Sequence, residues 1–140
     1  MTSIDFYSHV HDPIAIVLRL VGRAMTPQGK VRVLTPDAAT TDALDRMLWL
    51  QPATAFVPHC RLDSALASET PVIVDHALTH DGGANVLINL TQEPPPFFTR
   101  FERLLEFVGT DDEAVARGRE RYRYYRDRGY PLAAHNMAGG

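Results

Sequence analysis

The chain has 140 residues, a formal net charge of −3, an apolar share of 45% and one cysteine, Cys60. This length and composition predict one globular domain with its own core, and the mild acidity argues against a protein that coats nucleic acid non-specifically. A lone cysteine excludes an internal disulfide framework and fits a reducing cytoplasm, and no apolar run approaches the roughly 20 residues that span a bilayer.

Strand and helix patterns alternate along the first part of the chain. Ile4–Ser8 alternates and is rich in aromatic and β-branched residues, which predicts a strand. Apolar residues recur at helical spacing in 14–25, and Asp12 before them is a suitable N-cap. Lys30–Leu34 is predicted as a second strand and Ala38–Leu50 as a second helix. Crossovers of this length join parallel strands, so we expect a sheet covered by helices.

The second part of the chain continues this pattern. Val72–Asp75 and Asn85–Leu90 are predicted strands, and the apolar run of the second suits a buried position. The apolar residues of Phe97–Val108 are spaced as on the inner face of a helix, and Gly109 ends it. A last helix follows, with Thr110 or Asp111 as its cap.

These elements predict one α/β domain over residues 1–132. We expect a Rossmann-like, three-layer α/β/α arrangement with a mostly parallel mixed sheet. The terminal segment 133–140, with sequence AAHNMAGG, is expected to be a flexible tail.

Histidines near acidic residues or cysteine raise the question of a metal site. Such a site needs three or four ligands that converge at about 2.0–2.3 Å, and spacing alone does not show convergence. One hypothesis is a small metal-dependent hydrolase; the alternative is that these histidines lie at strand ends and loops, satisfied by backbone or water. The candidate groups are His9, His11 and Asp12, with His76 as a further ligand; His59 with Cys60; and His76 with His80.

The motifs of common catalytic and nucleotide sites are missing from the sequence. The first strand–helix turn reads HVHDP rather than G-x-G-x-x-G, there is no P-loop, and Lys30 is the only lysine. Ser64 and Ser68 lack a G-x-S-x-G context, and nothing around Cys60 indicates a stabilised thiolate. We therefore expect no cofactor and no catalytic residue.

The segment 111–130, DDEAVARGRERYRYYRDRGY, is a local basic surface on this acidic chain. It holds six of the 14 Lys and Arg residues. A helical wheel turns Gly118 and Tyr125 inward, together with Val115 and Tyr122. The same wheel places three arginines on a neighbouring exposed face: Arg119, Arg123 and Arg126.

Two interpretations of this basic face remain open. One is a solvated helix with salt bridges to Glu120 and Asp127. The other is a docking site for an acidic peptide or, less favoured by the net charge, for a nucleic-acid backbone. Arginine forks suit carboxylates, and an adjacent apolar pocket would take a side chain.

Four stretches of the chain resemble one protein family, the chi subunit of bacterial DNA polymerase III. They are the opening DFY, the segment Ala43–His59 (ALDRMLWLQPATAFVPH), the strand NVLINL followed by an aromatic-rich predicted helix, and Arg119–Leu132 (RERYRYYRDRGYPL). They occur in the order and spacing of the family and extend from Ile4 to about Asn136.

The resemblance implies a non-enzymatic accessory subunit of the clamp-loader complex. Chi proteins link the replicase to single-stranded DNA-binding protein by binding its acidic C-terminal tail, which ends in Pro-Phe. They contact nucleic acid only indirectly and have a fold similar to nucleotide-binding domains. Carried over to this chain, the tail site comprises Arg119, Arg121, Tyr122, Arg123 and Arg126, with Val108 and Gly109 beside an apolar pocket.

The resemblance also implies a second interface, for the psi subunit or for a helicase that uses the same surface. It maps to Trp49, Phe56, Val57 and Pro58, and a large aromatic at a helix end is a common anchor for a partner. One departure concerns the tail site: Val115 stands where some relatives carry a lysine. The positive charge that faces the tail is smaller as a result.

Overall fold

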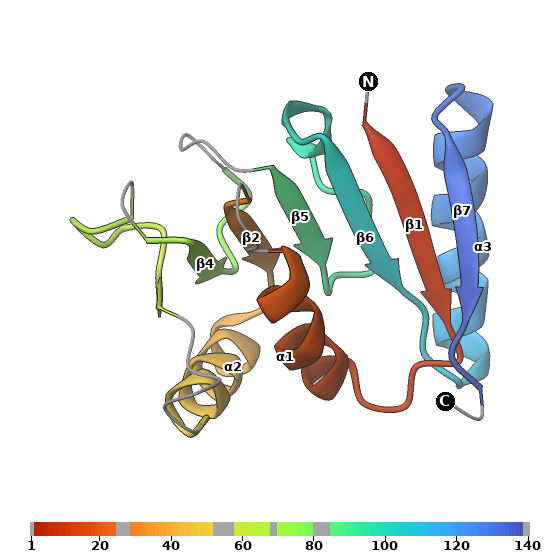
Figure 1. Ribbon diagram of the computed structural model, residues 1–140. Coiled ribbons are helices and arrows are strands. Elements are labelled where there is room, and N and C mark those ends of the chain that lie inside the picture. The colour runs from red at the N-terminus through yellow and green to blue at the C-terminus, as the bar shows by residue number, and fades with distance from the viewer. Residues whose placement is uncertain (1, 25–28, 52–57, 68–69, 80–84, 139–140) are drawn as a thin grey trace.

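The computed structural model describes residues 2–24, 29–51, 58–67, 70–79 and 85–138. Within them, seven strands form one sheet in the order β3-β4-β2-β5-β6-β1-β7 (Figure 1). Every pairing is parallel, so the α/β prediction is confirmed, although the expected antiparallel component is not found among these strands. The strands are β1 (Ser3–Ser8), β2 (Val31–Leu34), β3 (His59–Cys60), β4 (Val72–Asp75), β5 (Val86–Asn89), β6 (Arg103–Phe107) and β7 (Leu132–Asn136).

Helices cover both faces of the sheet, which confirms the three-layer prediction. Helices α1 (Pro13–Ala24) and α2 (Ala38–Trp49) lie on one face, and α3 (Asp112–Asp127) lies on the other (Figure 1). Side chains alternate between the faces along each strand, so two cores form. One core joins α1 and α2 to strand residues such as Val33, and the other joins α3 to residues such as Phe6.

The prediction of a helix over Phe97–Val108 is wrong. A short 3-10 turn, η1 (Phe98–Arg100), is followed by strand β6. Leu104 packs in the core under α3, and Leu105 packs in the opposite core. A strand buried on both faces carries apolar residues at consecutive positions, and this short run also fitted the helical spacing.

The prediction of a flexible tail over residues 133–140 is wrong for its first four residues. They belong to β7, which pairs with β1 from Ile4↔Leu132 to Ser8↔Asn136. Residues 139–140 lie outside the described part. No helix in the described residues is long and apolar enough to cross a membrane.

The crossovers from β1 and β6 leave the sheet on opposite faces. The chain passes from β1 to α1 on one face, whereas it passes from neighbouring β6 to α3 on the other. Adjacent parallel strands whose connections diverge leave a crevice at their carboxyl ends. The candidate site lies beside this crevice, under α3.

Candidate functional site

An N-cap residue fixes the start of helix α3, and one glycine lets the helix pack close to the sheet. The Asp111 carboxylate accepts a hydrogen bond from the backbone N–H of Ala114 at 2.8 Å, and Asp111 is the N-cap. A Cβ on Gly118 would lie 2.7 Å from a methyl carbon of Val108, so only glycine allows this approach without a shift. Tyr125 lies two turns beyond Gly118 and is fully buried, with 0% exposure.

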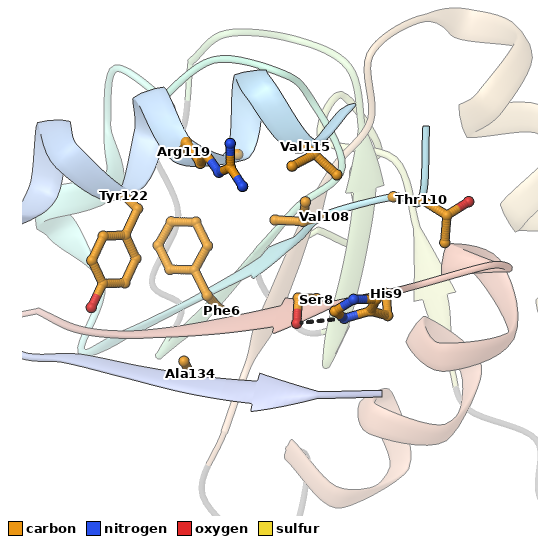
Figure 2. A pocket seen from close by; sticks show the side chains of 11 residues that line it. Phe6, Ser8, His9, Val108, Thr110, Val115, Arg119, Tyr122 and Ala134 are labelled. Carbon is orange, nitrogen blue, oxygen red and sulfur yellow. Dashed lines mark hydrogen bonds between the residues drawn. The ribbon is translucent and has the colours of Figure 1, made fainter. Parts of the chain in front are cut away.

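A pocket of about 360 Å³ opens between α3 and the ends of β1, β6 and β7. Figure 2 shows Arg119, Val115 and Tyr122 entering it from α3, opposite Phe6, Ser8 and His9 of the β1 side. Its walls are mostly apolar, and none of its described lining residues carries a carboxylate. The remaining lining residues are Val108, Gly109, Thr110, Gly118 and Ala134.

The structure brings four of the predicted tail-site residues together. Val108, Gly109, Arg119 and Tyr122 all line the pocket. Arg119 is exposed and makes no ion pair with any residue that the structure describes. Val108 and Gly109 follow a strand rather than the helix predicted there.

Arg123 and Arg126 lie outside the pocket lining, although both are exposed on α3. Arg126 pairs with its neighbour Asp127 at 3.2 Å, as the solvated-helix interpretation anticipated. Arg117 pairs with Glu93 at 3.5 Å on another side of the helix. The arginines of this helix therefore do not act as one cationic face.

Arg121 is not a surface residue, and its assignment to the tail site is wrong. It is 1% exposed, and its guanidinium donates to Glu106 Oε1 at 3.1 Å and to the carbonyl oxygen of Phe107 at 3.1 Å. Tyr125 donates its hydroxyl proton to the same carboxylate at 2.6 Å, and Asn89 donates its amide N–H at 3.0 Å. Burial raises the pKa of Glu106 to about 7, although Arg121 and these hydrogen bonds act to lower it. Arg121 therefore fastens α3 to the sheet.

Sequence reasoning missed the pocket residues that come from the strands. Phe6 and Ser8 share one face of β1, and Ala134 lies on β7, in the part of the chain predicted to be a flexible tail. His9 was considered only as a metal ligand. The alternation in the first strand does place Phe6 and Ser8 on one face, but it gives no information about which helix covers that face.

A second exposed apolar surface lies at the end of α2. Trp49 is 61% exposed and packs edge-on against His59 at 5.0 Å between ring centroids. Met47 and Leu50 beside it are 40% and 69% exposed. Of the other residues predicted for the second interface, Pro58 is exposed, whereas Phe56 and Val57 lie outside the described residues.

The histidines do not form a metal site in the described residues. No three His, Cys, Asp or Glu side chains there are placed to hold one ion. Asp12 instead caps α1, because its Oδ1 accepts the N–H of Ala15 at 3.2 Å, and His59 Nε2 lies 3.3 Å from Asp45. His11 is exposed, and His80 lies outside the described residues. The hydrolase hypothesis based on His9, His11 and Asp12 has no support in this geometry.

Comparison with known proteins assigns the chain to a family. The family described as "DNA polymerase III chi subunit, HolC" matches residues 1–133. The DNA polymerase III subunit chi of Pseudomonas aeruginosa is 33% identical over 98% of each chain. The protein of that name from Haemophilus influenzae is 31% identical over 77% of this chain and 76% of its own length. The one from Escherichia coli is 27% identical over 94% of this chain and 88% of its own length. The chain therefore belongs to the DNA polymerase III chi subunit family.

Proposed function

We propose that this protein is an accessory subunit of bacterial DNA polymerase III that binds the acidic C-terminal tail of single-stranded DNA-binding protein. In this role it links the replicase, through the clamp-loader complex, to protein-coated single strands in the cytoplasm. Membership of the chi family supports the assignment to DNA polymerase III. The role requires neither catalysis nor a cofactor, since recognition of a peptide is sufficient.

The observation that carries the proposal is the combination of Arg119 with an apolar pocket. An acidic peptide with an aromatic end needs a cation for a carboxylate and a cavity for a ring. The pocket of about 360 Å³ is large enough for one aromatic side chain and is walled by Phe6, Val108 and Tyr122. Arg119 lines the same pocket and has no acidic partner in the described residues.

We place the terminal phenylalanine of the tail against Val108 and Tyr122, with its α-carboxylate on Arg119. Acidic residues upstream then pass near Arg123 and Arg126, which are exposed on the same helix. These outer pairs are solvated, so they contribute little individually and are screened by salt. Arg121 has no part in this arrangement because it is buried.

Calorimetric titration of a synthetic tail peptide tests the site. Arg119→Ala is expected to weaken binding about tenfold or more, because a charge-assisted contact is lost. Arg19→Ala is the matched control, since Arg19 is an exposed arginine on α1, across the sheet. A peptide without its terminal phenylalanine is expected to lose most of its affinity. Equal affinities of the Arg119→Ala and Arg19→Ala proteins would rule out the site.

We propose that the Trp49 surface is the second interface, for the psi subunit or a helicase. A tryptophan that is 61% exposed beside two further apolar side chains is typical of an interface anchor. Trp49→Ala is expected to abolish co-purification with the partner. Leu78→Ala is the control, because Leu78 is 64% exposed at another position. Equal loss in both variants would point to a general effect of apolar area rather than to this surface.

A further inference from the structure

His9 adopts an unusual backbone conformation at the wall of the pocket. Its φ is 59°, and no other non-glycine residue in the described chain has a positive φ. This left-handed region is disfavoured for residues with a Cβ, and such conformations concentrate where function requires them. The side chain is exposed, so it is not held there by core packing.

The conformation places the imidazole of His9 in the lining of the pocket. Figure 2 shows the ring next to Ser8 at the end of β1, with Arg119 entering from α3 on the opposite wall. His9 and Arg119 are the lining residues, among those described, whose side chains carry nitrogen. The loop between β6 and α3 contributes Val108, Gly109 and Thr110 to the lining, and β7 contributes Ala134.

The hydrogen bonds of the ring leave one nitrogen for a ligand. Nδ1 lies 3.1 Å from the Ser8 hydroxyl, and Nε2 has no partner in the described residues. The same hydroxyl donates to the carbonyl oxygen of His135 at 3.4 Å when its proton is not directed at Nδ1. When a carboxylate binds at Nε2, the ring proton lies on Nε2, which donates it to the carboxylate. Nδ1 is then an acceptor, and Ser8 donates its hydroxyl proton to Nδ1.

We propose that His9 donates from Nε2 to the α-carboxylate of the bound peptide and, with Arg119, clamps it from opposite walls. This inference rests on the proposed tail-binding function and adds a ligand that comes from β1. A carboxylate has acceptor sites for both donors, since its two oxygens offer about four lone-pair directions. Two donors fixed on different elements recognise a chain end more selectively than a single cation, which accepts any acidic side chain.

The test separates binding from folding by relieving the strain. His9→Gly removes the ring and suits a positive φ, so thermal stability is expected to stay equal or rise. Affinity for the tail peptide is nevertheless expected to fall about fivefold, as for one lost hydrogen bond of ordinary strength at an exposed site. His11→Gly is the matched control, because His11 is an exposed histidine two residues further on that does not line this pocket. It is expected to leave the affinity unchanged.

A peptide with an amidated C-terminus identifies the group that His9 contacts. With this peptide, wild type and His9→Gly are expected to bind equally weakly, whereas the fivefold difference persists when upstream aspartates are replaced by asparagine. If Arg119→Ala weakens binding but His9→Gly does not, the clamp is refuted and the tail site stands. If Arg119→Ala has no effect, the proposed function itself fails. A His9 effect that persists with the amidated peptide would overturn the α-carboxylate assignment.

Discussion

Replacing the buried Arg121 with methionine would separate its structural role from the binding role of Arg119. The substitution keeps an apolar stem and deletes the guanidinium, which donates to Glu106 and to the Phe107 carbonyl at 3.1 Å each. Removing one partner of a buried ion pair costs about 3–5 kcal/mol. Tyr125 still donates to the Glu106 carboxylate in this variant, so we expect a loss of stability at the lower end of that range, about 3 kcal/mol.

A loss of this size is a large part of the total stability, which for a domain is about 5–15 kcal/mol. At about 2–4 °C for each kcal/mol, the melting temperature falls by roughly 6–12 °C. Urea and thermal unfolding, followed by circular dichroism, measure both values. Arg119→Met is the control, because an exposed substitution changes stability by less than about 0.5 kcal/mol. Equal free energies of unfolding for the two variants would refute the structural role of Arg121.

The pH dependence of the Arg121→Met effect is a second readout. Burial raises the pKa of Glu106 from 4.5 to about 7, so its contribution to stability is complete below about pH 4.5 and is lost as the pH rises through 7. Arg121 acts to lower this pKa, and its removal therefore extends the loss to higher pH. The destabilisation by Arg121→Met is expected to grow between about pH 6 and pH 9. A constant cost over that range would contradict the role assigned to Glu106.

Three further substitutions test other parts of the molecule. Gly118→Ala is expected to destabilise the protein by about 1–3 kcal/mol, because the added Cβ would lie 2.7 Å from Val108. In urea unfolding, the double variant with Val108→Ala should lose less than the two single variants together. Val115→Lys adds a charge at the pocket and is expected to raise tail affinity about threefold in titrations at low salt, with no gain at about 0.5 M salt. Burial acts to raise the pKa of Asp75, but hydrogen bonds from backbone N–H groups hold it below its ordinary value, so its contribution is lost as the pH falls. Asp75→Asn should therefore lower the melting temperature at pH 7, and this effect should shrink as the pH falls below about 3.8.

The parts of the fold with strong periodicity were predicted well from the sequence. The predicted helix over 14–25 corresponds to α1, and Asp12 caps it as expected. The helical wheel of the last helix correctly predicted that Gly118 and Tyr125 face the core. These predictions succeed because side-chain direction along a helix follows directly from its period.

Other features depend on partners that are distant in the sequence. Arg121 faces the core at helical spacing, but a buried arginine is recognised only once Glu106, on another element, is known to meet it. Leu132–Asn136 contains no β-branched residue and becomes a strand because β1 offers it a free edge. His9 joins Arg119 only through the packing of α3 over β1.

The position of β1 in the sheet has a consequence for biosynthesis. This strand lies between β6 and β7, and both are made long after it leaves the ribosome. Until β6 and β7 emerge, the backbone N–H and C=O groups of β1 that pair with them remain exposed to solvent. The apolar side chains of Ile4 and Phe6 on its buried face are also exposed. Parallel pairings between distant segments form slowly and leave nascent chains prone to aggregation. Strand β1 is thus translated before both of its partners and completes its pairing only after they have been made.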